Sequence, residues 1–247
     1  KLTELGILTD REFLFRLLRV CREMGIFLVV DECFQDFIRE PGQYSLKAQL
    51  PRYHNLFLLK AFTKRYAMAG VRLGYGITEN EELLEKMTQA TQPWNISIPA
   101  QAAGIAALGE VEYVERARKL IFAESEYLSE ELYKLGMIVF PSQANYLFFK
   151  GPEDLEEQCQ KRGLLIRDCS NYRGLSGGYY RIAVRRREEN ERLLAALAQV
   201  TGSSVVENGK DDKKPAAVPD GIEYVMPQEI EKRSFSIIEE ELQLRGI

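Results

Sequence analysis

A short apolar segment, residues 26–30, constrains the fold of this chain more than any other feature. Its sequence, Ile-Phe-Leu-Val-Val, is continuous in apolar residues and favours a strand buried on both faces. The segment follows apolar residues at helical spacing, between a candidate cap at Thr9 or Asp10 and a terminating Gly25. A helix followed by such a strand is typical of an α/β domain with a mainly parallel sheet. Ligands of such sheets bind at the carboxyl ends of the strands, where Asp31 and Glu32 follow this one.

The pattern of apolar residues divides residues 1–200 into three parts with different predicted secondary structure. Residues 1–98 predict a large α/β part, with further strands at 56–59 and 73–77. Residues 99–136 are helical almost throughout and predict bridging helices with Gly109 as their joint. A small α+β domain is predicted over residues 137–200, with strands at 137–140, 145–149, 164–166 and 179–184 and helices at 152–162 and 187–200.

The two ends of the chain suggest a fragment. Residues 201–221 are dominated by Gly, Ser, Lys, Asp and Pro and predict a flexible linker. Residues 222–247 predict a short strand and a helix with too little apolar surface for a domain, so we expect the truncated start of a second domain. The chain begins at Lys1 without an initiator methionine, and we expect an N-terminal part to be missing.

Composition excludes several classes of function. The net charge of −4 and the pI of about 5.4 imply no general attraction for nucleic acids or membranes. No apolar run reaches the ~18 residues that a membrane span needs. The four cysteines form no CxxC pair and the chain has a single histidine, so no metal site is expected. Free thiols are typical of a cytoplasmic protein, which is the compartment we expect.

Lys64 and Arg72 are the first candidate site residues. They lie eight positions apart, between the apolar runs 56–59 and 73–77, so we expect both on a loop between two strands. A lysine becomes a nucleophile towards a carbonyl when burial or nearby cations lower its pKa. An arginine offers a planar fork for phosphate, and Gly70 and Gly74 beside it permit close approach of a ligand. The alternatives are a solvated lysine on a turn and an arginine paired with a carboxylate.

Asp31 and Thr63 complete this first set. A carboxylate at the end of a central strand can be rigid and half-buried, and can keep a pyridine nitrogen protonated so that the ring accepts electrons. The alternatives for Asp31 are a helix cap and an ion pair with Arg39. Thr63 could add a hydroxyl beside Lys64 for a phosphate.

Five short segments, taken in order, give a resemblance to a known family. The segments are Asp31-Glu32-Cys33-Phe34, Thr63-Lys64, Gly70-Val71-Arg72-Leu73-Gly74, Asn145-Tyr146 and Tyr180-Arg181-Ile182. The chain resembles the fold-type I pyridoxal-phosphate enzymes, the class I/II aminotransferase superfamily, from Lys1 to about Val200. The resemblance implies an incomplete large domain of that fold, a small α+β domain and a homodimer. It implies pyridoxal phosphate bound covalently by Lys64 and contacted by Asp31, Thr63 and Arg72, with Arg181 on the substrate carboxylate.

Within this superfamily the chain is most similar to the histidinol-phosphate aminotransferase branch, and more narrowly to the threonine-phosphate decarboxylases of cobalamin synthesis. The segments 165–172 and 179–185 carry this similarity and supply Arg167 and Arg181 as anion binders. The resemblance implies decarboxylation of threonine O-3-phosphate to aminopropanol phosphate. Amino transfer of the histidinol-phosphate type is the close alternative, and a non-catalytic fragment or binding module is the second.

Three further features qualify the resemblance. Phe34 stands where most aminotransferases have a tyrosine that bonds the cofactor's phenolic oxygen. Ala61 stands where many relatives have a serine or threonine on the phosphate. We therefore expect the phosphate to depend partly on groups outside the chain, and this fragment alone to be inactive. Residues 222–238 resemble the start of precorrin-8X methylmutase, a later cobalamin enzyme.

Overall fold

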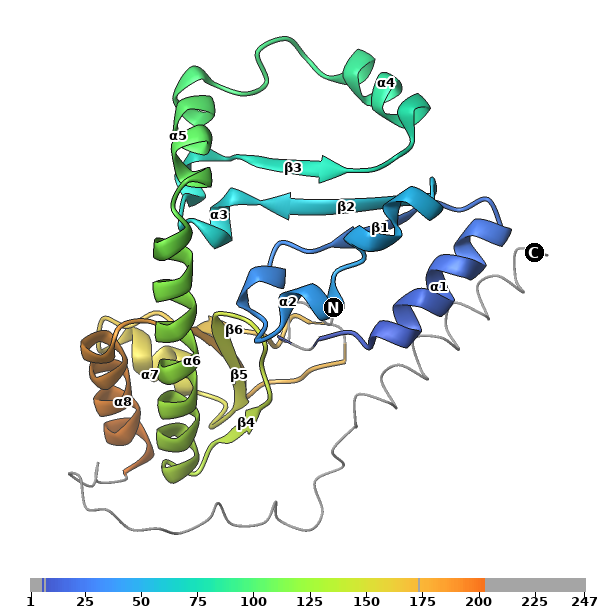
Figure 1. The fold of residues 1–247 in the computed structure, drawn as a ribbon. Coiled ribbons are helices and arrows are strands. Elements are labelled where there is room, and N and C mark those ends of the chain that lie inside the picture. The colour runs from blue at the N-terminus through green and yellow to red at the C-terminus, as the bar shows by residue number, and fades with distance from the viewer. Residues whose placement is uncertain (1–5, 7, 173, 203–247) are drawn as a thin grey trace. The chain divides into compact units, whose positions relative to one another are not determined.

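The computed structural model describes residues 6, 8–172 and 174–202 of the chain, and Figure 1 shows their fold. The described residues belong to one compact unit. They combine helices with two sheets, which confirms the predicted α/β class. The predicted linker beyond residue 202 and the segment 222–247 lie outside the described residues. The predicted boundaries between domains stay predictions.

The first sheet has the strand order β1-β2-β3 and sets the edge at which the candidate residues lie. Its strands are β1 (Leu28–Asp31), β2 (Leu56–Ala61) and β3 (Gly74–Ile77), side by side in Figure 1. β1 and β2 are parallel, with Asp31 opposite Leu59, whereas β2 and β3 are antiparallel. Because β1 and β2 run the same way, the residues that follow them emerge at one edge of the sheet.

Residues on the two faces of β1 differ in burial. Helix α1 (Arg11–Glu23) is capped by Asp10, whose carboxylate accepts a hydrogen bond from the Phe13 amide at 2.8 Å. A cluster on the covered face joins Leu18 to Leu56 and Leu58. On the other face Val29 is 56% exposed, so the prediction that β1 is buried on both faces was wrong. The burial of β1 therefore alternates along the strand, although Phe57 of β2, in register with Val29, is buried.

Helices and helical turns connect the first sheet to the second. Helix α4 (Glu81–Ala90) is capped by Asn80 and α5 (Ile98–Leu108) by Ser97. Gly109 ends α5, and α6 (Val111–Lys134) follows, as the sequence predicted. Shorter pieces complete this part: η2 (Gln35–Phe37), α2 (Pro41–Tyr44), η3 (Lys47–Arg52), α3 (Phe62–Arg65) and η4 (Ala69–Val71).

The second sheet is antiparallel throughout, with the order β4-β5-β7-β6. Its elements are β4 (Ile138–Phe140), β5 (Tyr146–Lys150), α7 (Leu155–Gln160), β6 (Arg167–Asp168), β7 (Tyr179–Ala183) and α8 (Arg187–Thr201). Leu147, Phe149 and Ile182 point from alternate positions into a core closed by α6, α7 and α8. Each fully buried leucine or phenylalanine there stabilises the fold by about 1.5–3 kcal/mol.

The strand predicted at residues 164–166 lies elsewhere. The Leu164 amide donates to the Cys159 carbonyl at 3.0 Å, in a turn made by Gly163 at a φ of 71°. Ile166 is buried in the core, and pairing with β7 begins only at Arg167. The turn after α7 therefore includes Leu164, and β6 starts at Arg167, after the predicted strand.

Helix α6 contacts elements next to both sheets. Arg118 donates to the carbonyl oxygens of Asp36 in η2 and Arg39 just beyond it, the second at 3.1 Å. Two turns on, the buried Glu124 accepts from the Asn190 amide at 2.8 Å and pairs with Arg187 at 3.0 Å, both from the start of α8. These charge-assisted bonds tie the two parts to one helix.

Candidate functional site

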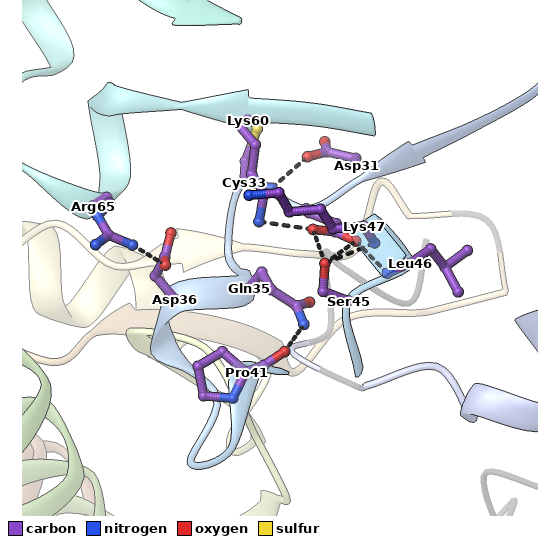
Figure 2. Close-up of polar contacts among 11 residues, drawn as sticks. Asp31, Cys33, Gln35, Asp36, Pro41, Ser45, Leu46, Lys47, Lys60 and Arg65 are labelled. Atoms are coloured by element: carbon purple, nitrogen blue, oxygen red, sulfur yellow. Dashed lines mark hydrogen bonds and ion pairs between the residues drawn. The ribbon is translucent and has the colours of Figure 1, made fainter. Parts of the chain in front are cut away.

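Two adjacent carboxylates at the end of β1 have different surroundings. Glu32 is 3% exposed, pairs with Lys60 of β2 at 2.7 Å, and accepts hydrogen bonds from Ser45 Oγ and the Leu46 amide. Asp31 is exposed, and its Oδ1 accepts from the Cys33 amide at 2.9 Å, in the tight turn that follows the strand (Figure 2). The carboxylate of Glu32 is thus occupied by contacts within the fold, whereas that of Asp31 is accessible to solvent.

The structure decides between the alternatives for Asp31. Arg39 pairs with Glu126 of α6 and not with Asp31. Asp31 does not cap a helix either: its bond to Cys33 closes a turn, and η2 begins after Phe34 without a side-chain cap. The expected half-burial of Asp31 is not seen, since its side chain is exposed.

Lys64 lies on a helical turn and not on the predicted loop. It occupies α3, which starts directly after β2, and its ammonium nitrogen lies 5.4 Å from the centre of the Phe34 ring. That distance is within the range of a cation–π contact. The helix begins at Ala61 without a side-chain cap, which is the position where a serine or threonine was expected in relatives. Lys64 itself is exposed.

The thiol of Cys33 shows that Asp31 and Lys64 lie at one edge. Burial first, and the hydrogen bond and charge of Asp31 second, raise the pKa of Cys33 to about 12. The charges of Lys60 and Lys64 act in the opposite direction on the same pKa. A carboxylate and two ammonium groups therefore surround this thiol, as the parallel pairing of β1 and β2 requires.

Arg65 anchors the helical turn that carries Lys64. Its guanidinium pairs with the Asp36 carboxylate of η2 (Figure 2), while Arg118 binds the Asp36 carbonyl oxygen. Burial alone would lower the pKa of Arg65, but Asp36 and Tyr66 more than offset this and the pKa is raised. The helical turn η2, which follows Phe34, is thus tied to the turn that presents Lys64.

Arg72 and Thr63 complete the segment. Arg72 follows η4 in a left-handed conformation, with a φ of 57°, and donates from Nη1 to the Ala69 carbonyl at 3.1 Å. Among the residues that the structure describes it forms no ion pair, and its side chain is exposed. Thr63 is half-buried on α3, which packs against η4. A non-glycine residue at positive φ costs of order 1–3 kcal/mol, and such strain is concentrated at ligand sites.

The glycines around Arg72 have structural roles. A Cβ at Gly74 would lie 2.9 Å from the Lys60 carbonyl oxygen, so glycine lets β3 approach β2. A Cβ at Gly70 would meet nothing within 4 Å. The predicted reason for Gly74, close approach of a ligand, is therefore replaced by strand packing.

The two candidate substrate arginines lie directly opposite each other. Arg167 of β6 pairs in register with Arg181 of β7, so their side chains share one face of the sheet. Burial raises the pKa of Cys169, and the charges of Arg181 and Arg167 both counter that rise. Arg167 is exposed and Arg181 half-buried. Like charges opposite each other destabilise a sheet, and an anion bound between the two guanidinium groups would offset that cost.

Two aromatic rings connect the arginine pair to the lysine. The Arg181 guanidinium carbon lies 4.6 Å from the centre of the Tyr146 ring. Tyr146 contacts Phe34 edge to face, with centroids 5.7 Å apart at 89°. Phe34 in turn lies under Lys64. The sequence pattern gave Tyr146 only as part of a matching segment; its place in β5, on the face shared with Arg181, is the signal that identifies it.

A cavity of about 100 Å³ lies beside this row. Asp31, Phe34 and Gln143 are among its lining residues, whereas Lys64, Arg72 and Arg181 are not. Within residues 6, 8–172 and 174–202, no helix is long and apolar enough to cross a membrane. In the same residues no group of His, Cys, Asp or Glu could hold a metal ion. All four cysteines are free thiols.

Comparison with known proteins gives a family. The model of the family "Aminotransferase class I and II" matches residues 5–197. The threonine-phosphate decarboxylase of Salmonella typhimurium is 33% identical over 199 residues, which are 79% of this chain and 54% of the relative. A histidinol-phosphate aminotransferase of Anaeromyxobacter sp. is 37% identical over 180 residues, 71% of this chain and 49% of the relative.

A solved structure agrees with these relatives. The histidinol-phosphate aminotransferase of Clostridium acetobutylicum superposes with a TM-score of 0.75 at 33% identity, over 80% of this chain and 60% of that one. The chain spans about half the length of the curated relatives that it matches. The family and these relatives are pyridoxal-phosphate-dependent aminotransferases and decarboxylases. The chain therefore belongs to the class I and II aminotransferase family of pyridoxal-phosphate enzymes.

Proposed function

We propose that the protein decarboxylates a phosphorylated amino acid, L-threonine O-3-phosphate, to aminopropanol phosphate. The observation on which this rests is the pair formed by Arg167 and Arg181, opposite each other on β6 and β7. The similarity to threonine-phosphate decarboxylases supports the choice of substrate. We expect a cytoplasmic homodimer.

The residues at the edge of the first sheet fit pyridoxal phosphate. Asp31 keeps an exposed carboxylate that can stay beside the ring nitrogen, and Lys64 offers an amine at the same edge. Arg72 and Thr63 would bind the phosphate, with Ala61 contributing no hydroxyl. When bound, the cofactor supplies a ring that accepts electrons from the substrate's α-carbon.

The arginine pair suits a substrate with two anionic groups. Threonine phosphate carries an α-carboxylate and a phosphate, and guanidinium groups bind both in bidentate fashion. Histidinol phosphate carries a phosphate but no carboxylate. If Arg181, with Arg167, fixes the carboxylate, it also fixes which bond at the α-carbon is aligned for cleavage. Lys64 is then the group that returns a proton to the α-carbon.

Amino transfer is the second candidate. Histidinol-phosphate aminotransferases are as similar to this chain as the decarboxylases are. An amino donor such as glutamate carries two carboxylates and would also suit the arginine pair. The two candidates differ in the bond that breaks, and the binding residues would be shared.

The deciding experiment uses the full-length protein with pyridoxal phosphate. L-Threonine O-3-phosphate is added and released carbon dioxide is measured; in parallel, histidinol phosphate is added with 2-oxoglutarate and glutamate is measured. Release of carbon dioxide from threonine phosphate is expected. Glutamate formation without any carbon dioxide would contradict decarboxylation and favour the second candidate.

Lysine variants test whether the protein is a catalyst or a binding module. Borohydride is expected to attach the cofactor to Lys64, and Lys64→Ala to abolish both attachment and turnover. The matched control is Lys86→Ala, on the exposed face of α4, where Lys86 pairs with Glu82. Cofactor attachment that survives Lys64→Ala would show that the lysine is wrongly assigned.

A further inference from the structure

We propose that Tyr146 is a positioning residue, whose ring holds the guanidinium of Arg181 ready for an anionic group of the substrate. This inference rests on the proposed function of Arg181. The contact is direct, since the guanidinium carbon lies 4.6 Å from the ring centre. An arginine side chain loses considerable rotamer freedom when it binds a ligand. A ring that already holds it in place reduces that loss at the moment of binding.

The ring of Tyr146 is itself fixed. Tyr146 is 6% exposed, begins β5 and pairs in register with Ala183 of β7. Its ring meets Phe34 at 89°, the edge-to-face arrangement that aromatic pairs favour. Phe34 belongs to the turn after β1, and the ammonium nitrogen of Lys64 lies over the Phe34 ring, 5.4 Å from its centre. The position of Arg181 is therefore set by groups that also contact the lysine.

An aromatic ring holds a cation without cancelling its charge. A carboxylate in the same place would compete with the substrate's carboxylate for the guanidinium. Burial raises the pKa of Tyr146, and this outweighs the opposing effects of Arg181 and of the Gly6 backbone. The phenol therefore stays neutral at physiological pH and places no negative charge beside Arg181.

A second arginine on a tyrosine provides the matched comparison. Arg187 lies 3.6 Å from the centre of the Tyr127 ring and also pairs with Glu124 at 3.0 Å. Its charge is compensated, and it joins α8 to α6. Among the arginine–tyrosine contacts of the described residues, the one between Arg187 and Tyr127 lies in the scaffold, away from the candidate site. Replacing each tyrosine by leucine removes the same kind of contact at the two places.

The test measures binding without reaction. The full-length protein loaded with pyridoxal phosphate is titrated calorimetrically with 3-phosphonopropionate, which carries a carboxylate and a phosphonate but no amine. Tyr146→Leu is expected to weaken binding by roughly 5- to 30-fold, the value of a cation–π contact in a desolvated setting. Tyr146→Phe keeps the ring and should weaken binding less than Tyr146→Leu. Tyr127→Leu should leave the affinity unchanged.

Each outcome bears on the proposal. Borohydride attachment of the cofactor shows that a variant is folded and loaded. Tyr146→Leu that is loaded and binds the probe as tightly as wild type overturns the proposal, as does equal weakening by Tyr127→Leu. Wild type that does not bind the probe overturns it too, because the arginines would then not form an anion site. Wild type that binds the probe but turns over neither phosphate substrate contradicts only the proposed function.

Kinetics supply a second readout where turnover is seen. A positioning role predicts that Tyr146→Leu raises KM for threonine phosphate more than it lowers kcat. Recovery of KM in Tyr146→Phe would assign the effect to the ring and not to the hydroxyl. A fall in kcat alone, with KM unchanged, would contradict the proposal.

Discussion

Replacing Glu32 by glutamine should destabilise the protein through Lys60. Glu32 is 3% exposed and its partner's side chain 15% exposed, with 2.7 Å between Oε2 and Nζ. At that distance and an effective dielectric constant of about 20, Coulomb's law gives about 6 kcal/mol of attraction. Desolvation of both groups offsets part of it, and removing one partner of a buried pair typically costs about 3–5 kcal/mol. Because Lys60 retains some solvent contact, we expect about 3 kcal/mol.

A double-mutant cycle isolates this pair. Glu32→Gln, Lys60→Met and the double variant are unfolded in urea, and the free energies of unfolding are compared with wild type. If the pair is coupled, the double variant loses at least about 2 kcal/mol less than the sum of the single losses. Hydrogen exchange of the Leu46 amide, which donates to Glu32 at 2.9 Å, should accelerate locally in both single variants.

Additivity would refute this account of the pair. If the two single losses add to within about 0.5 kcal/mol, the groups do not stabilise each other in solution. The prediction is independent of the proposed reaction, since Glu32 and Lys60 are placed in the scaffold and Asp31 in the site. Glu32→Gln should therefore leave borohydride attachment of the cofactor at Lys64 intact.

Two further predictions concern the same sheet. Gly76→Ala should lower the free energy of unfolding by about 1–3 kcal/mol in urea titrations, because its Cβ would lie 2.1 Å from the Phe57 ring. The control Gly42→Ala has open space around its Cβ and should be near neutral. Equal losses of stability in the two variants would contradict this prediction. Alkylation of Cys33 at pH 9 should be far slower than that of a free cysteine, because burial first and Asp31 second raise its pKa to about 12. Alkylation should be faster in Asp31→Asn than in wild type. Equal rates in the two proteins would contradict the contact between Asp31 and Cys33. The folded state favours the protonated thiol, so this stabilisation is complete below the ordinary pKa of 9.0 and is lost as pH rises towards 12.

The sequence predicted most helices because their signals are local. The cap at Asp10 and the break at Gly109 each depend on a few neighbouring residues, and both are seen. The strand at 164–166 was misplaced because apolar residues also occur in a connection that leads into a core. Apolar content alone does not distinguish Ile166, buried before a strand, from a residue within it.

Contacts between distant segments lay beyond the sequence pattern. The pairing of Glu32 with Lys60 depends on the register of β1 with β2, and the contact of Tyr146 with Phe34 joins residues from different sheets. Burial of β1 was overestimated because a continuous apolar run does not reveal whether both faces are covered. The candidate site residues were inferred from their spacing and from the family resemblance, and their roles stay predictions. The structure shows which residues each of them contacts.

The contacts of α6 have a mechanical consequence. Arg118 holds the backbone of η2, next to Phe34, and Glu124 holds the start of α8, which packs on the sheet bearing Arg181. The two residues are six positions apart, which corresponds to about 9 Å along the helix axis. A rigid-body rotation of α6 at its Gly109 joint would carry both attachments together. The loop that carries Phe34 and the helix that packs behind Arg181 would then shift as one unit.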